Sequence, residues 1–262
     1  MKIDKKLVVD TSDPRNQAVL ELLLNDGSDV VSLPMLLSSN SELDQPIVLL
    51  LSPTYTPACV VKDINMPSDS IVFYGKLDKA TLDIWQDKGI TMHRYFDDQN
   101  LTLLNADLTA EGALASIIDN TKVSLLHLNV LLIGNGRVAT AMTKLLSHNH
   151  VSVSILSREQ DDKTYTSNQS ITKYNFGDNI PWDKYHCIVN TVPAMVLDYQ
   201  LHYLSKDCFV LDVASLPGGV DFELAKQLDI NTRHYLAIPS RVTPLTAASY
   251  IIQSIFKRLK IN

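Results

Sequence analysis

Short apolar runs bounded by turn residues recur along this chain, a pattern typical of strands buried in a parallel sheet. In the first third of the chain the runs cover residues 6–10, 47–51 and 71–74. Asp13 followed by Pro14 predicts the start of a helix that ends at Gly27. A second helix is predicted from about residue 77 to residue 88, closed by Gly89. The first third therefore predicts a small α/β layer.

A longer helical pattern leads into a second set of apolar runs. Residues 109–126 carry apolar side chains at helical spacing and continue into the run 129–133. The strand candidates that follow cover residues 151–156, 186–190, 208–213 and 232–236. Because these runs alternate with helical or loop segments, they predict a parallel, doubly wound sheet.

The predicted fold class is therefore α/β, with a Rossmann-like doubly wound parallel sheet and a smaller N-terminal α/β domain. We expect the N-terminal domain to cover residues 1–108, an interdomain helix residues 109–126, and the Rossmann domain residues 127–244. Residues 245–259 carry one apolar face and end in basic side chains, as a helix C-terminus would. We expect this helix, within residues 245–262, to pack back on the first domain.

Size, charge and cysteine content narrow the class of protein. A chain of 262 residues is long enough for two cores, and its net charge of -6 argues against a nucleic-acid partner. We expect no membrane segment, because no apolar run approaches the ~20 residues that span a bilayer. The cysteines Cys59, Cys187 and Cys208 lie too far apart in the sequence for a typical metal site. We therefore expect reduced thiols and no metal. We expect a cytoplasmic protein, because charged residues interrupt any signal-peptide apolar region at the N-terminus and no apolar run is long enough to span a membrane.

A glycine turn follows the run 129–133 and opens an amphipathic helix. It reads Gly134-Asn135-Gly136-Arg137-Val138-Ala139. In a dinucleotide-binding turn the first glycine allows the tight bend, the second lets the backbone approach a pyrophosphate, and the alanine permits close packing of helix on strand. We assign residues 134–138 to cofactor binding; the alternative is an ordinary glycine turn of an α/β sheet.

The residues after the next strand bear on the choice between NADP(H) and NAD(H). An NAD site usually has Asp or Glu about 20 residues beyond the glycines, where it binds the ribose 2′-hydroxyl. Here that place holds Ser157 and Arg158, which suit a 2′-phosphate. We predict NADP(H), with NAD(H) less favoured. In the alternative reading, Arg158 is a solvated loop residue and Glu159 binds the NAD ribose.

Two further loops follow strands whose carboxyl ends face the ligand side of an open α/β sheet. Thr191, Val192 and Pro193 follow one strand, and Ala214 and Ser215 follow the next. We assign all five residues to cofactor binding. Their hydroxyls and prolines are equally compatible with ordinary loop chemistry.

Several strings of the sequence resemble the family of dipicolinate synthase A subunits. The most distinctive string is Asp212-Val213-Ala214-Ser215-Leu216-Pro217-Gly218-Gly219-Val220-Asp221-Phe222. Others are Gly134 to Arg137, residues 189–194, Pro239-Ser240-Arg241-Val242-Thr243-Pro244, Asp13-Pro14-Arg15, Asn105 and Thr109-Ala110-Glu111-Gly112-Ala113. The chain departs from the family at Thr11-Ser12 and at Ala237 and Ser240, where the family has glycines, and at Leu126, where the family has histidine.

The resemblance implies an NADP(H)-dependent oxidoreductase component that transfers hydride on dihydrodipicolinate or a similar small cyclic carboxylate. It also implies a second, flavoprotein-like subunit. We expect a homo-oligomer. The alternative is a non-catalytic NADP(H)-binding subunit or sensor. We expect the substrate between the two domains. The candidate substrate-binding residues are Arg15, Glu111, Ser215, Gly218, Pro239 and Arg241. No residue is assigned as catalytic, and Glu111 could equally be a favourable charge near a helix N-terminus.

Overall fold

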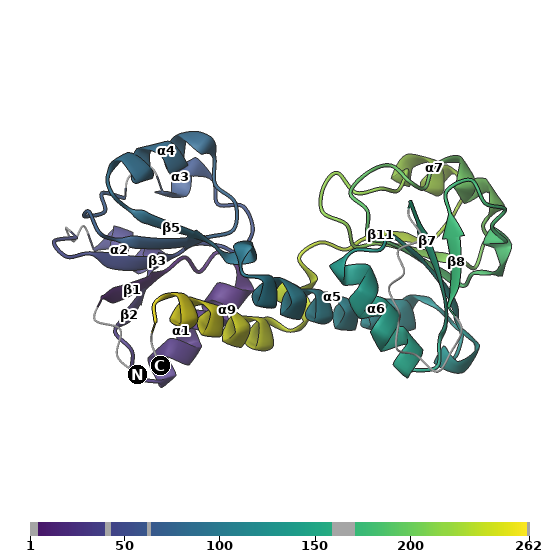
Figure 1. The fold of residues 1–262 in the computed structure, drawn as a ribbon, viewed down its shortest axis with the longest axis horizontal. Coiled ribbons are helices and arrows are strands. Elements are labelled where there is room, and N and C mark those ends of the chain that lie inside the picture. Colours follow the sequence, from purple (N-terminus) through teal and green to yellow (C-terminus); the bar gives the residue numbers. More distant parts are fainter. Residues whose placement is uncertain (1–4, 40–42, 62–63, 159–170, 261–262) are drawn as a thin grey trace. The chain divides into compact units, whose positions relative to one another are not determined.

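The computed structural model describes residues 5–39, 43–61, 64–158 and 171–260. The chain divides into two compact units, one formed by Met1–Asn105 with Pro239–Asn262 and the other by Ala106–Ile238. Each unit has a parallel sheet with helices on its faces, so the predicted α/β class is confirmed (Figure 1).

The sheet of the first unit has the strand order β2-β1-β3-β4-β5, with every neighbouring pair parallel. Its strands are β1 Lys6–Val9, β2 Val30–Ser32, β3 Ile47–Leu50, β4 Ile71–Tyr74 and β5 Thr91–Arg94. Its helices are α1 Pro14–Asn25, α2 Leu33–Ser38, α3 Ala58–Val61, α4 Lys79–Asp87 and α9 Pro244–Arg258, with a 3-10 turn η1 at Tyr95–Asp97.

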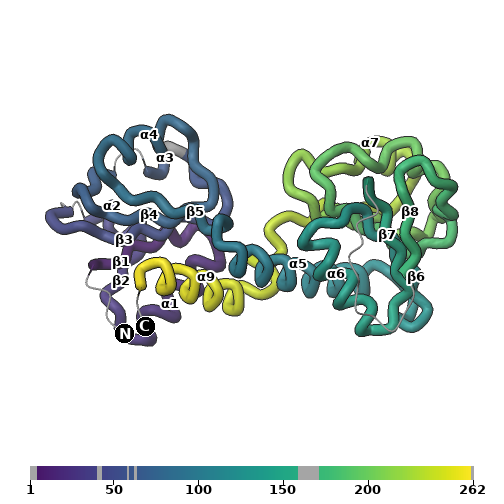
Figure 2. The backbone as a smooth tube through the Cα atoms, in the orientation of Figure 1, coloured from purple at the N-terminus to yellow at the C-terminus, as the bar shows by residue number. Residues whose placement is uncertain are grey.

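Both faces of this sheet are covered, because successive side chains of a strand point to opposite sides. Leu7 and Val9 of β1 pack with α1 and α9, whereas Val8 packs on the other face with residues of α2 and α4. Ala248 and Ile251 of α9 belong to the same buried cluster as Val19 of α1. Helix α9 therefore packs back on the first unit, as the sequence predicts, and runs alongside α1 (Figures 1 and 2).

The sheet of the second unit has the order β11-β10-β9-β6-β7-β8, again parallel throughout. Its strands are β6 Asn129–Ile133, β7 Ser152–Ser157, β8 Thr172–Asn175, β9 Cys187–Asn190, β10 Phe209–Asp212 and β11 Thr232–His234. The chain builds outward from β6 in one direction and then, from β9, in the other. This is the strand order of the dinucleotide-binding fold, with its switch point between β6 and β9.

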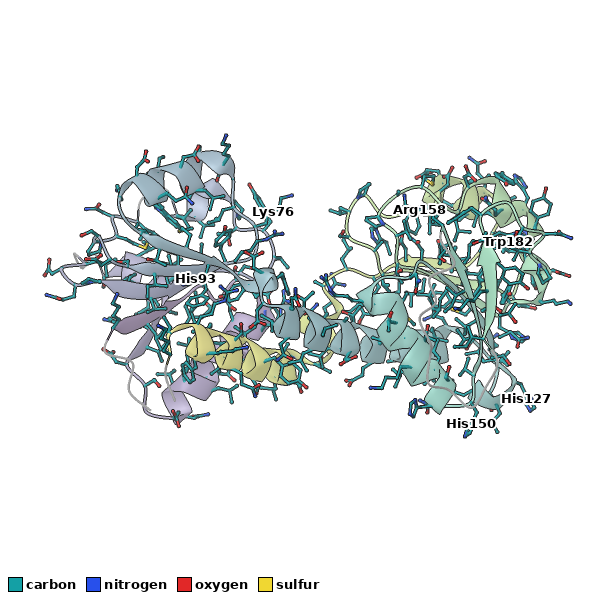
Figure 3. The ribbon with its side chains drawn as sticks, in the orientation of Figure 1. Lys76, His93, His127, His150, Arg158 and Trp182 are labelled. Carbon is teal, nitrogen blue, oxygen red and sulfur yellow. The ribbon has the colours of Figure 1, made fainter. Side chains whose placement is uncertain are left out.

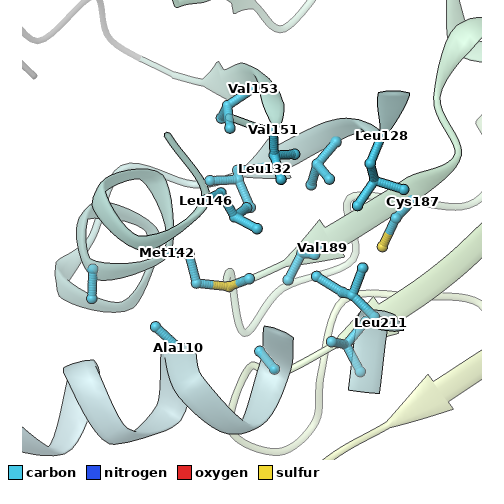
Figure 4. Close-up of a cluster of buried hydrophobic side chains, with 14 of the residues drawn as sticks. Ala110, Leu128, Leu132, Met142, Leu146, Val151, Val153, Cys187, Val189 and Leu211 are labelled. Carbon is cyan, nitrogen blue, oxygen red and sulfur yellow. The ribbon is translucent and has the colours of Figure 1, made fainter. Parts of the chain in front are cut away.

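Two helices cover one face of this sheet. They are α5 Gln99–Asn120, of which the part from Ala106 belongs to this unit, and α6 Arg137–His148. Ala110 of α5 and Met142 of α6 meet Leu132 and Val189 of the sheet in one buried cluster (Figure 4). The other face carries the 3-10 turns η3 Trp182–Lys184 and η4 Tyr199–Tyr203 and the helix α7 Phe222–Gln227.

The long helix differs from its predicted bounds. It begins at Gln99 rather than 109 and ends at Asn120, and a separate 3-10 turn, η2, covers Leu125–His127. The Asp98 carboxylate accepts the N–H groups of Asn100 and Leu101, so the helix starts there.

Helix α5 also bears on the membrane expectation. Among the described residues it alone has the length and hydropathy of a membrane-spanning helix. The pattern of apolar runs did not indicate this helix. Half of that stretch is buried within the protein, and Ala110, Ala113 and Ile117 are core residues. The buried side chains account for its apolar composition.

Candidate functional site

The glycine turn after β6 lies against the loop after β9. Gly134 has φ +111°, a conformation that favours glycine, and a Cβ on it would overlap the Thr191 hydroxyl oxygen. Thr191 is fixed in this place because its N–H and its hydroxyl both donate to the carbonyl of Ile133, at 3.0 and 2.9 Å. Two of the predicted cofactor residues therefore pack directly on each other at the switch point of the sheet.

The second glycine stands at the N-cap position of α6. A Cβ on Gly136 would meet no heavy atom within 4 Å, so the space beside it is open. Gly136 offers no capping side chain, unlike Asp13 before α1 or Asp221 before α7. The first N–H groups of a helix have no partner within the helix and carry its positive dipole end. The open N-terminus of α6 can therefore receive an anion.

The other residues of the turn divide by exposure. Asn135 and Val138 are half-buried, and Arg137 is exposed. Ala139 is fully buried, which allows the close packing of α6 on the sheet that the sequence predicts.

The carboxyl end of β7 lies beside this turn. The N–H of Gly134 donates to the carbonyl of Leu156 at 2.8 Å. Ser157 ends β7 and is half-buried, while the next residue, Arg158, is exposed. Figure 3 shows Arg158 at the end of the unit opposite His127 and His150. Glu159, the residue of the alternative NAD reading, lies outside the described residues.

A buried polar pair that the sequence analysis missed joins the ends of β9 and β10. Asn190 and Asp212 are partners in the ladder and are both 0% exposed. The amide nitrogen of Asn190 donates to Asp212 Oδ1 at 2.9 Å. Asn190 also binds the N–H and the carbonyl of Val192, both at 2.9 Å. Asp212 accepts the N–H of Ala214 at 3.0 Å and that of Gly219 at 2.7 Å.

This pair explains the glycines of the most distinctive string. Gly218 has φ +84°, and a Cβ on it would lie 2.8 Å from Asp212 Oδ2. A Cβ on Gly219 would lie 2.6 Å from the Asn190 amide nitrogen. The backbone thus approaches the polar pair more closely than any side chain allows. The substrate role of Gly218 stays a prediction, but its packing alone requires glycine.

The two loops after β9 and β10 are also bonded to each other. The N–H groups of Val196 and Leu197 both donate to the carbonyl of Gly219, at 2.9 and 3.0 Å. The predicted cofactor residues of these loops differ in exposure: Ala214 is buried, Val192 and Thr191 are half-buried, and Pro193 and Ser215 are exposed.

In the first unit, Arg15 is already paired. Its guanidinium makes two bonds to Asp13, with Nε 2.9 Å from Oδ1 and Nη2 2.8 Å from Oδ2, and the residue is only 3% exposed. Burial alone would raise the pKa of Asp13, but the hydrogen bonds and charge of Arg15 outweigh it and lower that pKa. The Ser240 hydroxyl donates to the same carboxylate at 3.1 Å. The positive charge of Arg15 is therefore neutralised locally.

Other polar groups at the carboxyl edge of this first sheet carry no clear signal in the sequence. Asp10 accepts the N–H groups of Ser12 and Ser52, at 3.0 and 3.2 Å. Asn16 donates to the carbonyls of Asp10 and Leu51, and Tyr95 donates to Leu51 as well. Burial raises the pKa of the Tyr95 phenol. These groups tie the loops after β1 and β3 together.

The remaining candidates lie on two helices. Pro239 is buried and Arg241 is exposed on α8, Ile238–Val242. Glu111 is exposed on α5, about three turns beyond the helix start, so its reading as a charge near the helix N-terminus is wrong.

The departures from the family glycines have structural consequences. Ala237 keeps φ +54°, a backbone conformation that glycine adopts without strain. Ser240 instead uses its side chain, which binds Asp13.

The cysteines are free thiols in the structure, with Cys187 and Cys208 buried. Burial raises the pKa of Cys208 to about 12, and burial also raises the pKa of Cys187. Neither is ionised near neutral pH, so neither is suited to act as a nucleophile.

The fold and the glycine turn together define a class: an α/β protein whose second unit has the Rossmann-type fold of dinucleotide-binding domains. No protein-family profile matches the chain. The A subunit of dipicolinate synthase from Bacillus subtilis (strain 168) is 22% identical over 195 residues, which are 74% of this chain and 66% of that protein. The alignment thus spans just under two thirds of that relative's length.

Solved structures show the same likeness. The A subunit of dipicolinate synthase from Bacillus halodurans superposes with a TM-score of 0.77 at 18% identity, covering 97% of this chain and 98% of that chain. The corresponding chain of the Bacillus subtilis synthase gives 0.79 at 17% identity, covering 98% and 96%. The resemblance to the A subunits of dipicolinate synthase, first seen in the sequence strings, is confirmed.

A similar fold occurs in a dehydrogenase that was solved with NAD+. D-lactate dehydrogenase with NAD+ from Lactobacillus jensenii superposes with a TM-score of 0.54 at 12% identity, covering 100% of this chain and 98% of that chain. At such an identity the likeness establishes the fold alone.

Proposed function

We propose that this protein is an NADP(H)-dependent oxidoreductase component similar to the A subunit of dipicolinate synthase. The observation that carries the proposal is the open N-terminus of α6 at the switch point of the second sheet. Gly136 leaves room there for a pyrophosphate, and the helix N-terminus supplies N–H groups and positive potential. Gly134, Asn135, Arg137 and Val138 complete the turn that holds it.

The cofactor is NADP(H) in this proposal, on the strength of Ser157 and Arg158. Ser157 ends β7 and Arg158 follows it, next to the glycine turn, where the adenosine ribose lies in this fold. The exposed Arg158 guanidinium offers a planar set of donors to a 2′-phosphate.

The bound cofactor supplies or accepts the hydride, and the chain binds and orients it. The strands β9, β10 and β11 form the nicotinamide half of this fold. Thr191, Val192 and Pro193 on one loop and Ala214 and Ser215 on the other are then the groups beside the nicotinamide. Holding the ring against the substrate and excluding water is their contribution to the rate.

The substrate is a small cyclic carboxylate such as dihydrodipicolinate. In this proposal the exposed residue Ser215 faces the substrate, and the exposed residue Arg241 binds a carboxylate of it. Arg15 instead holds the loop of the first unit through Asp13, because its charge is already matched. Pro239 shapes the backbone of α8, and the exposed Glu111 remains a candidate proton acceptor.

The relatives are named as one lettered component of a synthase, which implies a further subunit in those proteins. We propose a second, flavoprotein-like subunit for this protein too, with this chain forming a homo-oligomer in the cytoplasm. The test is an assay of NADP(H) turnover with dihydrodipicolinate, with and without that subunit. We expect NADP(H) turnover when this chain is present. Omitting this chain should abolish that turnover.

A second candidate is a non-catalytic NADP(H)-binding subunit. It is favoured by one observation: the buried polar groups at the ends of β9 and β10, Asn190 and Asp212, are bonded to each other and to backbone groups. They are thus not poised to move a proton. Tight NADPH binding without turnover in the same assay would select this candidate.

A further inference from the structure

A buried carboxylate without a cation is costly, so Asp212 needs a physical account. The ion pairs recorded among the described residues do not include it. Its two carboxyl oxygens accept from three N–H donors: the Asn190 amide and the N–H groups of Ala214 and Gly219. Two of these three donors belong to the loop after β10, so Asp212 shapes that loop.

Its partner shapes the neighbouring loop in the same way. Asn190 accepts the N–H of Val192 and donates to its carbonyl, which fixes the start of the loop after β9. Because Asn190 and Asp212 are bonded to each other, the two loops are held in one arrangement. A third group supports it: the His234 ring nitrogen Nε2 lies 3.0 Å from the Ala214 carbonyl, and the ring stacks on Phe222.

The Asn190–Asp212 pair lies at the ends of β9 and β10, and this position indicates which part of the cofactor it serves. In this fold the adenosine half of a dinucleotide lies by β6, β7 and β8, and the nicotinamide half by β9, β10 and β11. The polar pair touches the loops of the second half. The glycine turn and Arg158 belong to the first half.

We infer that Asn190 and Asp212, supported by His234, are positioning residues that set the two loops holding the nicotinamide ring. This inference rests on the proposed function. It predicts that damage to the pair disturbs the nicotinamide half of the cofactor site and spares the adenosine half. A pair with a merely structural role would affect both halves alike.

The experiment uses the full chain and two probes, NADPH and adenosine 2′,5′-bisphosphate, which lacks the nicotinamide. In Asp212→Asn one backbone N–H loses its acceptor, while the side chain keeps its size. We expect its dissociation constant for NADPH to rise at least tenfold and the fluorescence change of bound NADPH to be lost. Binding of the bisphosphate, measured by calorimetry, should stay within twofold of wild type.

The matched control is Asp221→Asn, which makes the same chemical change in a carboxylate that caps α7 by accepting the N–H of Leu224. It should leave both probes unchanged. If Asp212→Asn does not fold, His234→Phe provides the second variant, because it keeps a ring against Phe222 but removes the contact with the Ala214 carbonyl. It should weaken NADPH about threefold and spare the bisphosphate.

The outcomes separate the two proposals. Equal weakening of both probes in folded Asp212→Asn or His234→Phe would overturn the positioning role, and so would wild-type binding of NADPH in these variants. Wild-type protein that binds neither probe would instead overturn the proposed function.

Discussion

Replacing Gly136 by valine should remove cofactor binding while leaving the fold intact. The residue has φ -81° and ψ -171°, an extended conformation open to valine, and a Cβ there meets no heavy atom within 4 Å. Valine is a poorer N-cap residue than glycine by about 0.5–1 kcal/mol. Valine also lowers the conformational entropy of the unfolded chain, which stabilises the folded state by a similar amount and offsets that loss. The free energy of unfolding should therefore change by less than about 1 kcal/mol.

The effect on binding should be much larger. A hydrogen bond to a charged group contributes about 1.5–3 kcal/mol. If the valine side chain keeps the pyrophosphate from at least two N–H groups at the start of α6, at least about 3 kcal/mol is lost, which raises the dissociation constant on the order of 100-fold. Calorimetric titration with NADPH and thermal unfolding of the same sample would measure both quantities. Unchanged NADPH affinity in a folded variant would refute the reasoning.

The first glycine of the turn provides the contrast. Gly134→Ala forces a side chain into a left-handed conformation and into the Thr191 hydroxyl. We expect it to lower the free energy of unfolding by about 1–3 kcal/mol. Loss of binding in Gly134→Ala at wild-type stability would contradict this distinction between the two glycines.

Three other tests address separate parts of the account. Arg158→Ala should weaken NADPH about tenfold or more and leave NADH unchanged in parallel titrations; equal weakening of both would exclude a 2′-phosphate contact. Arg15→Ala leaves Asp13 buried without its cation and should lower stability to urea by about 3–5 kcal/mol; wild-type stability would return Arg15 to the substrate candidates. Because the pKa of Asp13 is lowered in the folded state, the stability from this pair is complete above its ordinary value of 3.8 and is lost as the pH falls below it, which acid titration followed by circular dichroism would detect.

The central strands could be located from the sequence because both of their faces are buried. The runs 71–74 and 129–133 match β4 and β6 residue for residue. The strands that were not predicted, β2, β5 and β8, lie at sheet edges, where side chains are half-exposed and partly polar. These three edge strands lack the continuous apolar run that marks a buried strand.

The site was predictable where its chemistry is local. The glycine turn stands out because strand, glycines and helix follow one another within a few residues. Asn190 and Asp212 lie 22 residues apart and become partners only through the register of β9 and β10. The contact of Ser240 with Asp13 spans 227 residues and depends on α8 and α9 returning to the first unit. One signal was available: each of Asn190 and Asp212 is a polar residue that ends an apolar run.

The most direct test of the central claim is calorimetric titration of the wild-type chain with NADPH and with NADH under identical conditions. The account predicts that both bind at one site per chain and that NADPH binds more tightly, because Arg158 stands where an NAD site would place a carboxylate. Equal or tighter binding of NADH would contradict the choice of NADP(H). If neither NADPH nor NADH binds, the assignment of the glycine turn to cofactor binding is contradicted.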